Sequence, residues 1–144
     1  MYDTILVPTD GSSDARQGAE HAVGLASALG ATVHALYVIE EGTNPWSSAS
    51  LDDQLDEARA YGEELTGEVA DMAADAGVDC VTATKVGPHV HDEINKYVEE
   101  EDIDAIVMGS GFRGSMGDVL GSTADKVLRT AMVPVTVLRR GETN

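Results

Sequence analysis

The segment Asp3–Ser12 (DTILVPTDGS) sets a pattern that the rest of the chain repeats. Its first part, Asp3–Thr9, is a short run of mostly apolar and β-branched residues that ends beside Pro8, which is typical of a buried parallel strand. Gly11 and the hydroxyl and carboxyl side chains that follow it provide a turn and helix N-caps. The segment therefore predicts a buried strand that leads directly into a helix.

The same unit of strand and helix recurs along the 144 residues. Further buried strands are predicted at Thr32–Ile39, Val78–Val86, Ile103–Met108 and Val133–Leu138. Apolar residues at helical spacing predict the four intervening helices, with a polar loop at about residues 40–50. Such alternation predicts one α/β domain over residues 1–144, a Rossmann-like or flavodoxin-like sandwich with a five-stranded parallel sheet and four helices on its two faces. Spacing alone leaves the strand order open.

The composition excludes several classes of protein. Lys and Arg number 9 against 26 Asp and Glu, so the net charge is −17, which disfavours binding to nucleic acid or anionic lipid. No apolar run is long enough to span a membrane, and the N-terminus lacks the plan of a signal peptide. With a single cysteine, Cys80, no intrachain disulfide is possible. We expect a cytoplasmic protein, and the scarcity of lysine favours a halophilic source whose high salt screens the charge.

The charge is unevenly distributed along the chain. Residues 50–104 contain 17 acidic and 3 basic residues, whereas residues 105–140 contain 5 basic and 2 acidic residues. The second region also holds five of the 15 glycines, between Gly109 and Gly121. Glycines allow the backbone to approach a ligand and to point N–H groups at it. The C-terminal region is therefore predicted to bind an anion.

Two predicted strand ends have the chemistry of a ligand site. The first is Pro8-Thr9-Asp10, and the second is the glycine-rich loop that ends at Gly121-Ser122-Thr123 and opens a helix. A helix N-terminus attracts phosphate through its unpaired N–H groups and its dipole, although Ser122 and Thr123 are also ordinary N-cap residues. In an open α/β sheet, ligands bind beyond the carboxyl ends of the strands.

Other nucleotide motifs fit less well. Gly121 precedes Ser122 without the lysine of a Walker A loop. Gly109–Gly114 matches G-x-G-x-x-G, but it follows the fourth predicted strand and no acidic residue ends a further strand about 20 residues later. Thr9–Ser13 is only a weak form of a flavin phosphate turn. An FMN- or NAD-using redox protein is therefore disfavoured. His89 and His91 lie near acidic residues, but we expect an exposed helix start there and no metal site.

Three segments together resemble the universal stress protein family. They are Ile5–Ser12, Val107–Ser110, and Gly121–Arg129 with the following Val133-Pro134-Val135. The resemblance implies strand order 3-2-1-4-5, with the change of direction between strands one and four. The ATP-binding branch carries G-2x-G-9x-G-S/T. Gly111 and Gly121 have nine residues between them, but Gly109 and Gly111 have one, so the first spacing is a residue short.

The resemblance also implies a function. It implies that ATP, or ADP or AMP, binds as a regulatory ligand in a stress response, with Mg²⁺ as a candidate accompanying ion. The implied contact residues are Pro8, Thr9, Asp10, Val38, Gly109, Gly111, Gly121, Ser122 and Thr123. It further implies a homodimer through Val133–Leu138. We expect no enzyme, because no lysine clamps a γ-phosphate and no base is positioned. The short first spacing favours the alternative, a dimeric interaction module of the same fold that binds no nucleotide.

Overall fold

The computed structural model describes residues 2–41, 51–111 and 120–139. Within them, five strands alternate with four helices. The strands are β1 (Thr4–Pro8), β2 (Thr32–Glu40), β3 (Cys80–Gly87), β4 (Ala105–Gly109) and β5 (Val135–Leu138). The helices are α1 (Ser13–Leu29), α2 (Leu51–Asp75), α3 (Val90–Glu100) and α4 (Ser122–Thr130). Most of the predicted 40–50 loop and of the glycine-rich loop lies outside the described residues.

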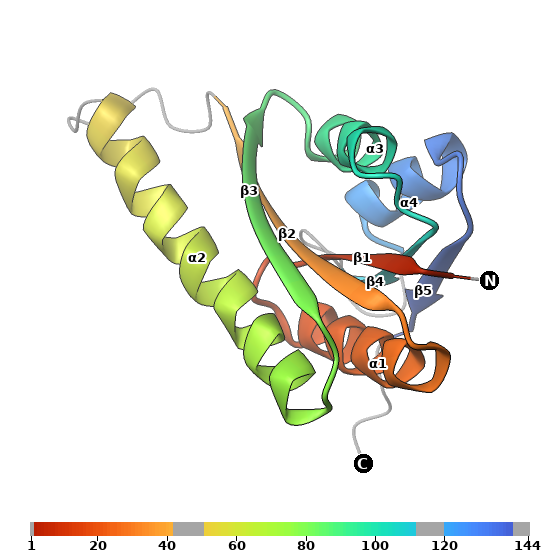
Figure 1. The fold of residues 1–144 in the computed structure, drawn as a ribbon. Coiled ribbons are helices and arrows are strands. Elements are labelled where there is room, and N and C mark those ends of the chain that lie inside the picture. Colours follow the sequence, from red (N-terminus) through yellow and green to blue (C-terminus); the bar gives the residue numbers. More distant parts are fainter. Residues whose placement is uncertain (1, 42–50, 112–119, 140–144) are drawn as a thin grey trace, which may run out of the picture.

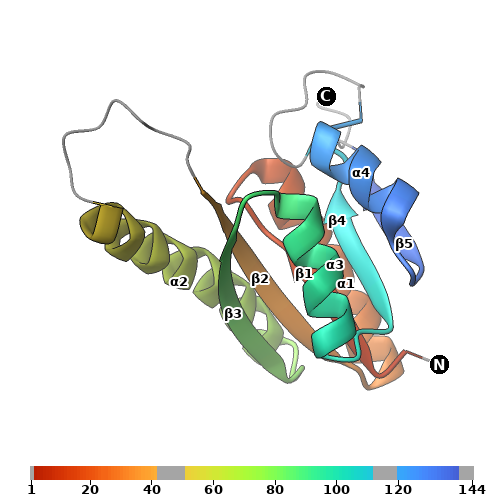
Figure 2. The same cartoon turned by 90° about the horizontal axis from the view of Figure 1, so that it is seen from above.

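The strands form one parallel sheet in the order β3-β2-β1-β4-β5. Helices α1 and α2 cover one face, and α3 and α4 cover the other (Figures 1 and 2). Each face has its own apolar core, because successive side chains of a strand point to opposite faces. Both the α/β sandwich and the strand order implied by the family resemblance are confirmed.

The ends of the first helix follow the predicted chemistry. Ser12 is the N-cap of α1, and its Oγ accepts a hydrogen bond from the Ala15 N–H at 3.1 Å. Gly30 ends the helix with φ of 70°, a conformation that a glycine adopts without strain. Local sequence therefore determines both ends of α1.

Three strands begin two residues later than predicted. The central strand β4 begins at Ala105 and not at Ile103. β5 begins at Val135 and not at Val133, because Pro134 has no N–H to donate, and its carbonyl instead accepts from the Ile106 N–H at 2.9 Å. β3 begins at Cys80, and this residue is half-buried and not buried as predicted. β3 pairs with β2 on one side only, so within the described residues its other edge has no neighbouring strand. The partial burial still raises the pKa of the Cys80 thiol, which disfavours the reactive thiolate.

The described acidic side chains of α2 lie on the surface of the protein. Every described acidic side chain of α2 is exposed, and Arg59 is the one basic residue of that helix. A surface of this kind repels itself less when salt screens the charges. The halophilic source stays a prediction.

A buried polar pair joins β2 to α3. The Nδ1 atom of His34 lies 2.8 Å from the Tyr97 hydroxyl, and the two residues are 7% and 3% exposed. Burial lowers the pKa of His34, an effect that the nearby Glu101 carboxylate opposes. Burial also raises the pKa of Tyr97 to about 12, so its hydroxyl stays protonated at neutral pH. The pair is therefore most stable with a neutral imidazole.

This pair predicts a pH dependence of stability. Because the pKa of His34 is lower in the folded than in the unfolded chain, the unfolded chain binds more protons as the pH falls below about 6.5. The contribution of His34 to the stability of the folded chain is then complete above that pH and is lost below it. We expect the free energy of unfolding, measured with denaturant between pH 7.5 and 5, to fall less steeply with decreasing pH in a His34→Gln variant than in the parent chain. A His21→Gln variant, at an exposed position, should keep the parent slope, and equal slopes for all three chains would contradict the assignment.

Candidate functional site

The strand order brings the two predicted strand ends side by side. β1 pairs with β4 in the centre of the sheet, with Ile5 opposite Ala105 and Leu6 opposite Ile106. The chain leaves β1 towards β2 and leaves β4 towards β5, so the strand order changes direction between them. Ligands of open α/β sheets bind at such a switch point. The turn after β1 and the described residues that follow β4, Ser110 and Gly111, therefore lie at the same edge of the sheet.

The turn after β1 is held by its own side chains. The Ser12 N–H donates to Asp10 Oδ1 at 2.9 Å, and the Gly11 N–H donates to Thr9 Oγ1 at 3.2 Å. The Thr9 N–H donates to the carbonyl of Leu36 at 2.9 Å, which ties the start of the turn to β2. Asp10 thus closes an Asx turn, and the bond orients its carboxylate at the end of β1.

The end of β4 lies against the start of α1. A Cβ atom at Gly109 would overlap the backbone carbonyl of Asp14, and a Cβ atom at Gly18 would lie 3.1 Å from the Gly109 nitrogen. Glycine is therefore required at both positions for the helix to approach the strand. Gly109 was predicted only as a ligand contact, and the structure adds this packing role. Gly18 was missed, although a glycine inside a helical pattern is itself an indication of close packing.

The start of α4 lies next to the end of β4. The Gly121 N–H donates to the Ser110 carbonyl at 2.7 Å, and the Ser110 N–H donates to the Leu138 carbonyl at 2.8 Å. Gly121 is the N-cap of α4 and provides no side chain to bond the first N–H groups of the helix. Ser122 is exposed and Thr123 is buried. The arrangement can present backbone N–H groups to an anion beside β4.

The remaining predicted contact residues lie close to these segments but are deeply placed. Pro8 is buried at the end of β1, and Val38 is 1% exposed within the core on the α3 side. Thr9 faces the opposite side of the sheet, where it lines a pocket beneath α2. Gly111 is buried at the limit of the described residues. All nine predicted residues therefore lie at or near the carboxyl edge of β1, β2 and β4, and their contact with a ligand stays a prediction.

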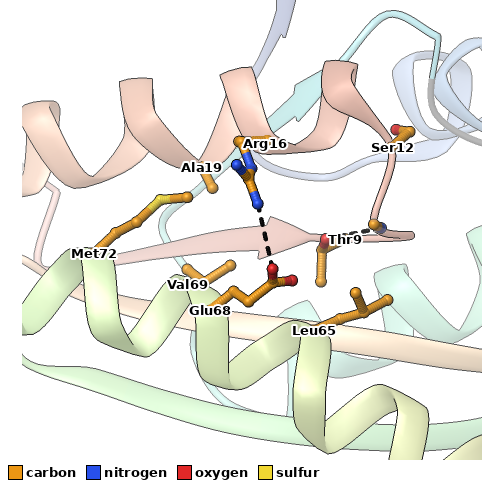
Figure 3. Close-up of a pocket in the computed structure, with 9 residues that line it drawn as sticks. Thr9, Ser12, Arg16, Ala19, Leu65, Glu68, Val69 and Met72 are labelled. Atoms are coloured by element: carbon orange, nitrogen blue, oxygen red, sulfur yellow. Dashed lines mark hydrogen bonds and ion pairs between the residues drawn. The ribbon is translucent and has the colours of Figure 1, made fainter.

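A small pocket lies between α1 and α2, behind the turn (Figure 3). It encloses about 260 Å³ with its open mouth, and Thr9, Gly11 and Ser12 line one side of it. Across its mouth, Arg16 forms an ion pair with Glu68 at 3.2 Å. Sequence reasoning missed this pair because its members are 52 positions apart and no motif relates them.

The described part of the chain holds neither a metal-binding cluster nor a membrane-spanning helix. Among residues 2–41, 51–111 and 120–139, no group of three or more His, Cys, Asp or Glu side chains is arranged to hold a metal ion. His91 lies 3.2 Å from Asp92, its neighbour in α3. Over the same ranges we find no helix that combines the length and hydrophobicity of a membrane span.

Comparison with known proteins agrees with this geometry. The profile of the Universal stress protein family matches residues 1–139. The chain belongs to the universal stress protein family. Among curated members, Universal stress protein MJ0531 of Methanocaldococcus jannaschii is 33% identical over 97% of this chain and 84% of that protein. The family resemblance read from the three sequence segments is thereby confirmed.

Solved structures of the family share the architecture. Universal stress protein UspA from Lactobacillus plantarum superposes with a TM-score of 0.83 at 28% identity, covering 96% of this chain and 98% of that one. A universal stress protein solved in complex with cAMP superposes with a TM-score of 0.74 at 25% identity, covering 95% and 97%. An adenine nucleotide is thus bound by at least one protein of this fold and family.

The conformation of the turn after β1 predicts that Gly11 cannot be replaced without loss of stability. Gly11 has φ of 82°, and a Cβ atom there would lie 2.9 Å from the Leu65 side chain. Replacement by alanine should therefore lower the free energy of unfolding by about 1–3 kcal/mol, through backbone strain and crowding. The matched control is Gly24→Ala in α1, where no atom lies within 4 Å of the added Cβ, and it should stabilise by up to about 1 kcal/mol. Equal stabilities of the two variants in urea unfolding would refute this assignment.

Proposed function

We propose that this protein binds an adenine nucleotide, ATP or its relatives ADP and AMP, as a regulatory ligand in a stress response. One observation carries the proposal. A hydrogen bond joins Ser110, after β4, to Gly121, at the start of α4, and β4 is the direct neighbour of β1, the strand that Asp10 follows. A phosphate-binding helix start and a carboxylate suited to a nucleoside thus share one switch point.

The chemistry of each half supports this ligand. The first N–H groups of α4 and the helix dipole attract phosphate oxygens, and Lys126 and Arg129 are exposed on the same helix. Arg129 is bonded to Asp125 at 3.0 Å, four residues earlier. Asp10, oriented by the Ser12 N–H, can accept a hydrogen bond from a ribose hydroxyl or an adenine amino group. Val38 and Pro8 would provide apolar contact for the base.

The comparison with solved relatives supports adenine as the base. The relative solved with cAMP is 25% identical and covers almost the whole chain. A regulatory role is favoured over catalysis, because the sequence provides no lysine in a Walker A position to clamp a γ-phosphate. Bound Mg²⁺, if required, would be carried by the nucleotide phosphates, and binding measured with and without MgCl₂ tests this.

The decisive experiment is to identify the ligand directly. Denaturing the purified protein should release an adenine nucleotide detectable by mass spectrometry, and calorimetry in molar KCl should show heat with ATP, ADP or AMP. A Gly121→Val variant should lose binding at least tenfold, because a side chain at the N-cap would stand where phosphate approaches α4. Gly67→Val is the control, since no atom lies within 4 Å of a Cβ at that position of α2.

No released nucleotide and no heat with the parent chain would overturn this function. Release of a flavin or of nicotinamide would instead support the disfavoured redox alternative. Undiminished binding by Gly121→Val would show that the site lies elsewhere.

A second candidate is a dimeric interaction module of the same fold that binds no nucleotide. Two observations favour it: the first glycine spacing is one residue short, and Gly109 has a packing role that needs no ligand. The calorimetry above separates the two candidates. In either case we propose a homodimer through the edge strand β5, antiparallel to its mate.

The surface beside β5 supports that dimer. β5 pairs only with β4, so its other edge has no neighbouring strand in the described sheet. Met132, just before the strand, is 93% exposed, and Leu128 of α4 is 45% exposed. Such apolar side chains next to an open strand edge are typical of an interface between subunits.

Sedimentation in molar KCl should therefore give twice the mass of the chain. A Met132→Glu variant should weaken the dimer at least tenfold, because it places a carboxylate in an apolar contact. Ala74→Glu, on the exposed side of α2, adds the same charge elsewhere and should leave the dimer intact. A monomeric parent chain at micromolar concentration would refute the dimer.

A further inference from the structure

The turn that carries Asp10 is supported from behind by α2. We propose that Leu65 and Glu68 of α2 are positioning residues for Asp10, and that the helix holds this turn in the shape that receives the nucleoside. The inference rests on the proposed nucleotide function and extends it to a helix that none of the predicted contact residues belongs to.

The first contact is between Gly11 and α2. The position that a Cβ atom of Gly11 would occupy lies 2.9 Å from Leu65 Cδ2 and 3.2 Å from the Tyr61 hydroxyl oxygen. The backbone of the turn therefore lies in van der Waals contact with the helix. Leu65 is only 6% exposed, so its side chain forms a fixed surface for the turn.

The second contact is the ion pair between Arg16 and Glu68. It joins the first part of α1 to α2 at 3.2 Å, with both side chains partly exposed. Three ion pairs occur among the described residues. The pair between Arg16 and Glu68 links two different helices, whereas the other two pairs lie within α3 and within α4. Because the N-cap Ser12 immediately precedes α1, a restraint on Arg16 is also a restraint on the turn.

Helix α2 is itself firmly seated. Gly62 is buried against β2 and β3, where a Cβ atom would lie 2.6 Å from the Tyr37 ring and 3.0 Å from the Thr84 hydroxyl. The Tyr37 and Tyr61 rings meet edge to face with centroids 5.8 Å apart. The close approach at Gly62 therefore places the next turns of α2, with Leu65 and Glu68, over the β1–α1 turn.

Between these two contacts the helices are not fully packed. The pocket of Figure 3 separates Thr9 and Ala19 on one side from Val69 and Met72 on the other. The two helices share an apolar core that includes Ala22, Val23 and Ala73, and nearer the turn Leu65 and Glu68 provide the contacts of α2 with Gly11 and Arg16. Loss of either contact should therefore alter the conformation of the turn after β1.

These contacts of α2 reach Asp10 through its neighbours in the turn. Gly11, which contacts Leu65, lies between Asp10 and the Ser12 N–H that donates to Asp10 Oδ1. When a binding side chain of the protein is already held in place, less conformational entropy is lost as the ligand binds. In most binding sites, the side chains that contact the ligand are held in position by residues that pack behind them. The fixed turn would thus strengthen nucleotide binding without any contact between α2 and the nucleotide.

The test compares Glu68→Gln with Glu64→Gln, which removes the same charge from an exposed position one helical turn earlier on α2. Two quantities are measured: hydrogen exchange of the Ser12 amide by NMR, and the Kd for AMP by calorimetry. Glu68→Gln should speed exchange of the Ser12 amide and raise the Kd, each by about two- to fivefold, the range expected for an exposed ion pair. Glu64→Gln should change neither. The exchanged pair Arg16→Glu with Glu68→Arg should restore both values.

The outcomes separate this inference from the function on which it rests. If Glu68→Gln leaves both quantities equal to those of Glu64→Gln, the inference is overturned and nucleotide binding stands. If the exchanged pair fails to restore them, the effect is not due to the ion pair, and the inference is likewise overturned. If the parent chain binds none of ATP, ADP and AMP although the Ser12 amide responds, the proposed function fails and the turn serves another purpose. Equal free energies of unfolding for the two single variants would exclude a general loss of stability.

Discussion

The close approach of α1 to the end of β4 is the constraint on which the candidate site depends. It is possible because Gly18 and Gly109 have no side chains where the helix and strand meet. The approach fixes the start of α1, and with it the turn that carries Asp10, relative to the loop that follows β4. Larger side chains there would force the helix away from the sheet and widen the switch point.

On each side of that contact, short backbone bonds complete the arrangement. The bond from the Gly121 N–H to the Ser110 carbonyl brings α4 back to the end of β4. The bond from the Thr9 N–H to the Leu36 carbonyl ties the turn to β2. The site is thus assembled from the ends of three parallel strands, which explains why it combines residues far apart in the chain.

Much of the fold was predictable from local sequence. The β-branched run at Thr4–Pro8, the Ser12 cap and the Gly30 stop each determine structure within a few residues. The predictions were least accurate at strand starts: β3, β4 and β5 each begin two residues later than predicted, and Cys80 is only half-buried. Pairing with neighbouring strands decides where a strand begins, and composition does not report that pairing.

The sequence by itself determined the alternation of strands and helices, the acidic surface and the family, because each depends on residue types and their spacing along the chain. The tertiary structure alone decided that Gly109 packs against α1, and that Arg16 and Glu68 meet across 52 positions. Contacts of this kind depend on how helices cross the sheet in three dimensions, and no periodicity records them. For the same physical reason, sequence motifs predict which residues would contact a ligand, whereas no motif predicts which helix lies behind them.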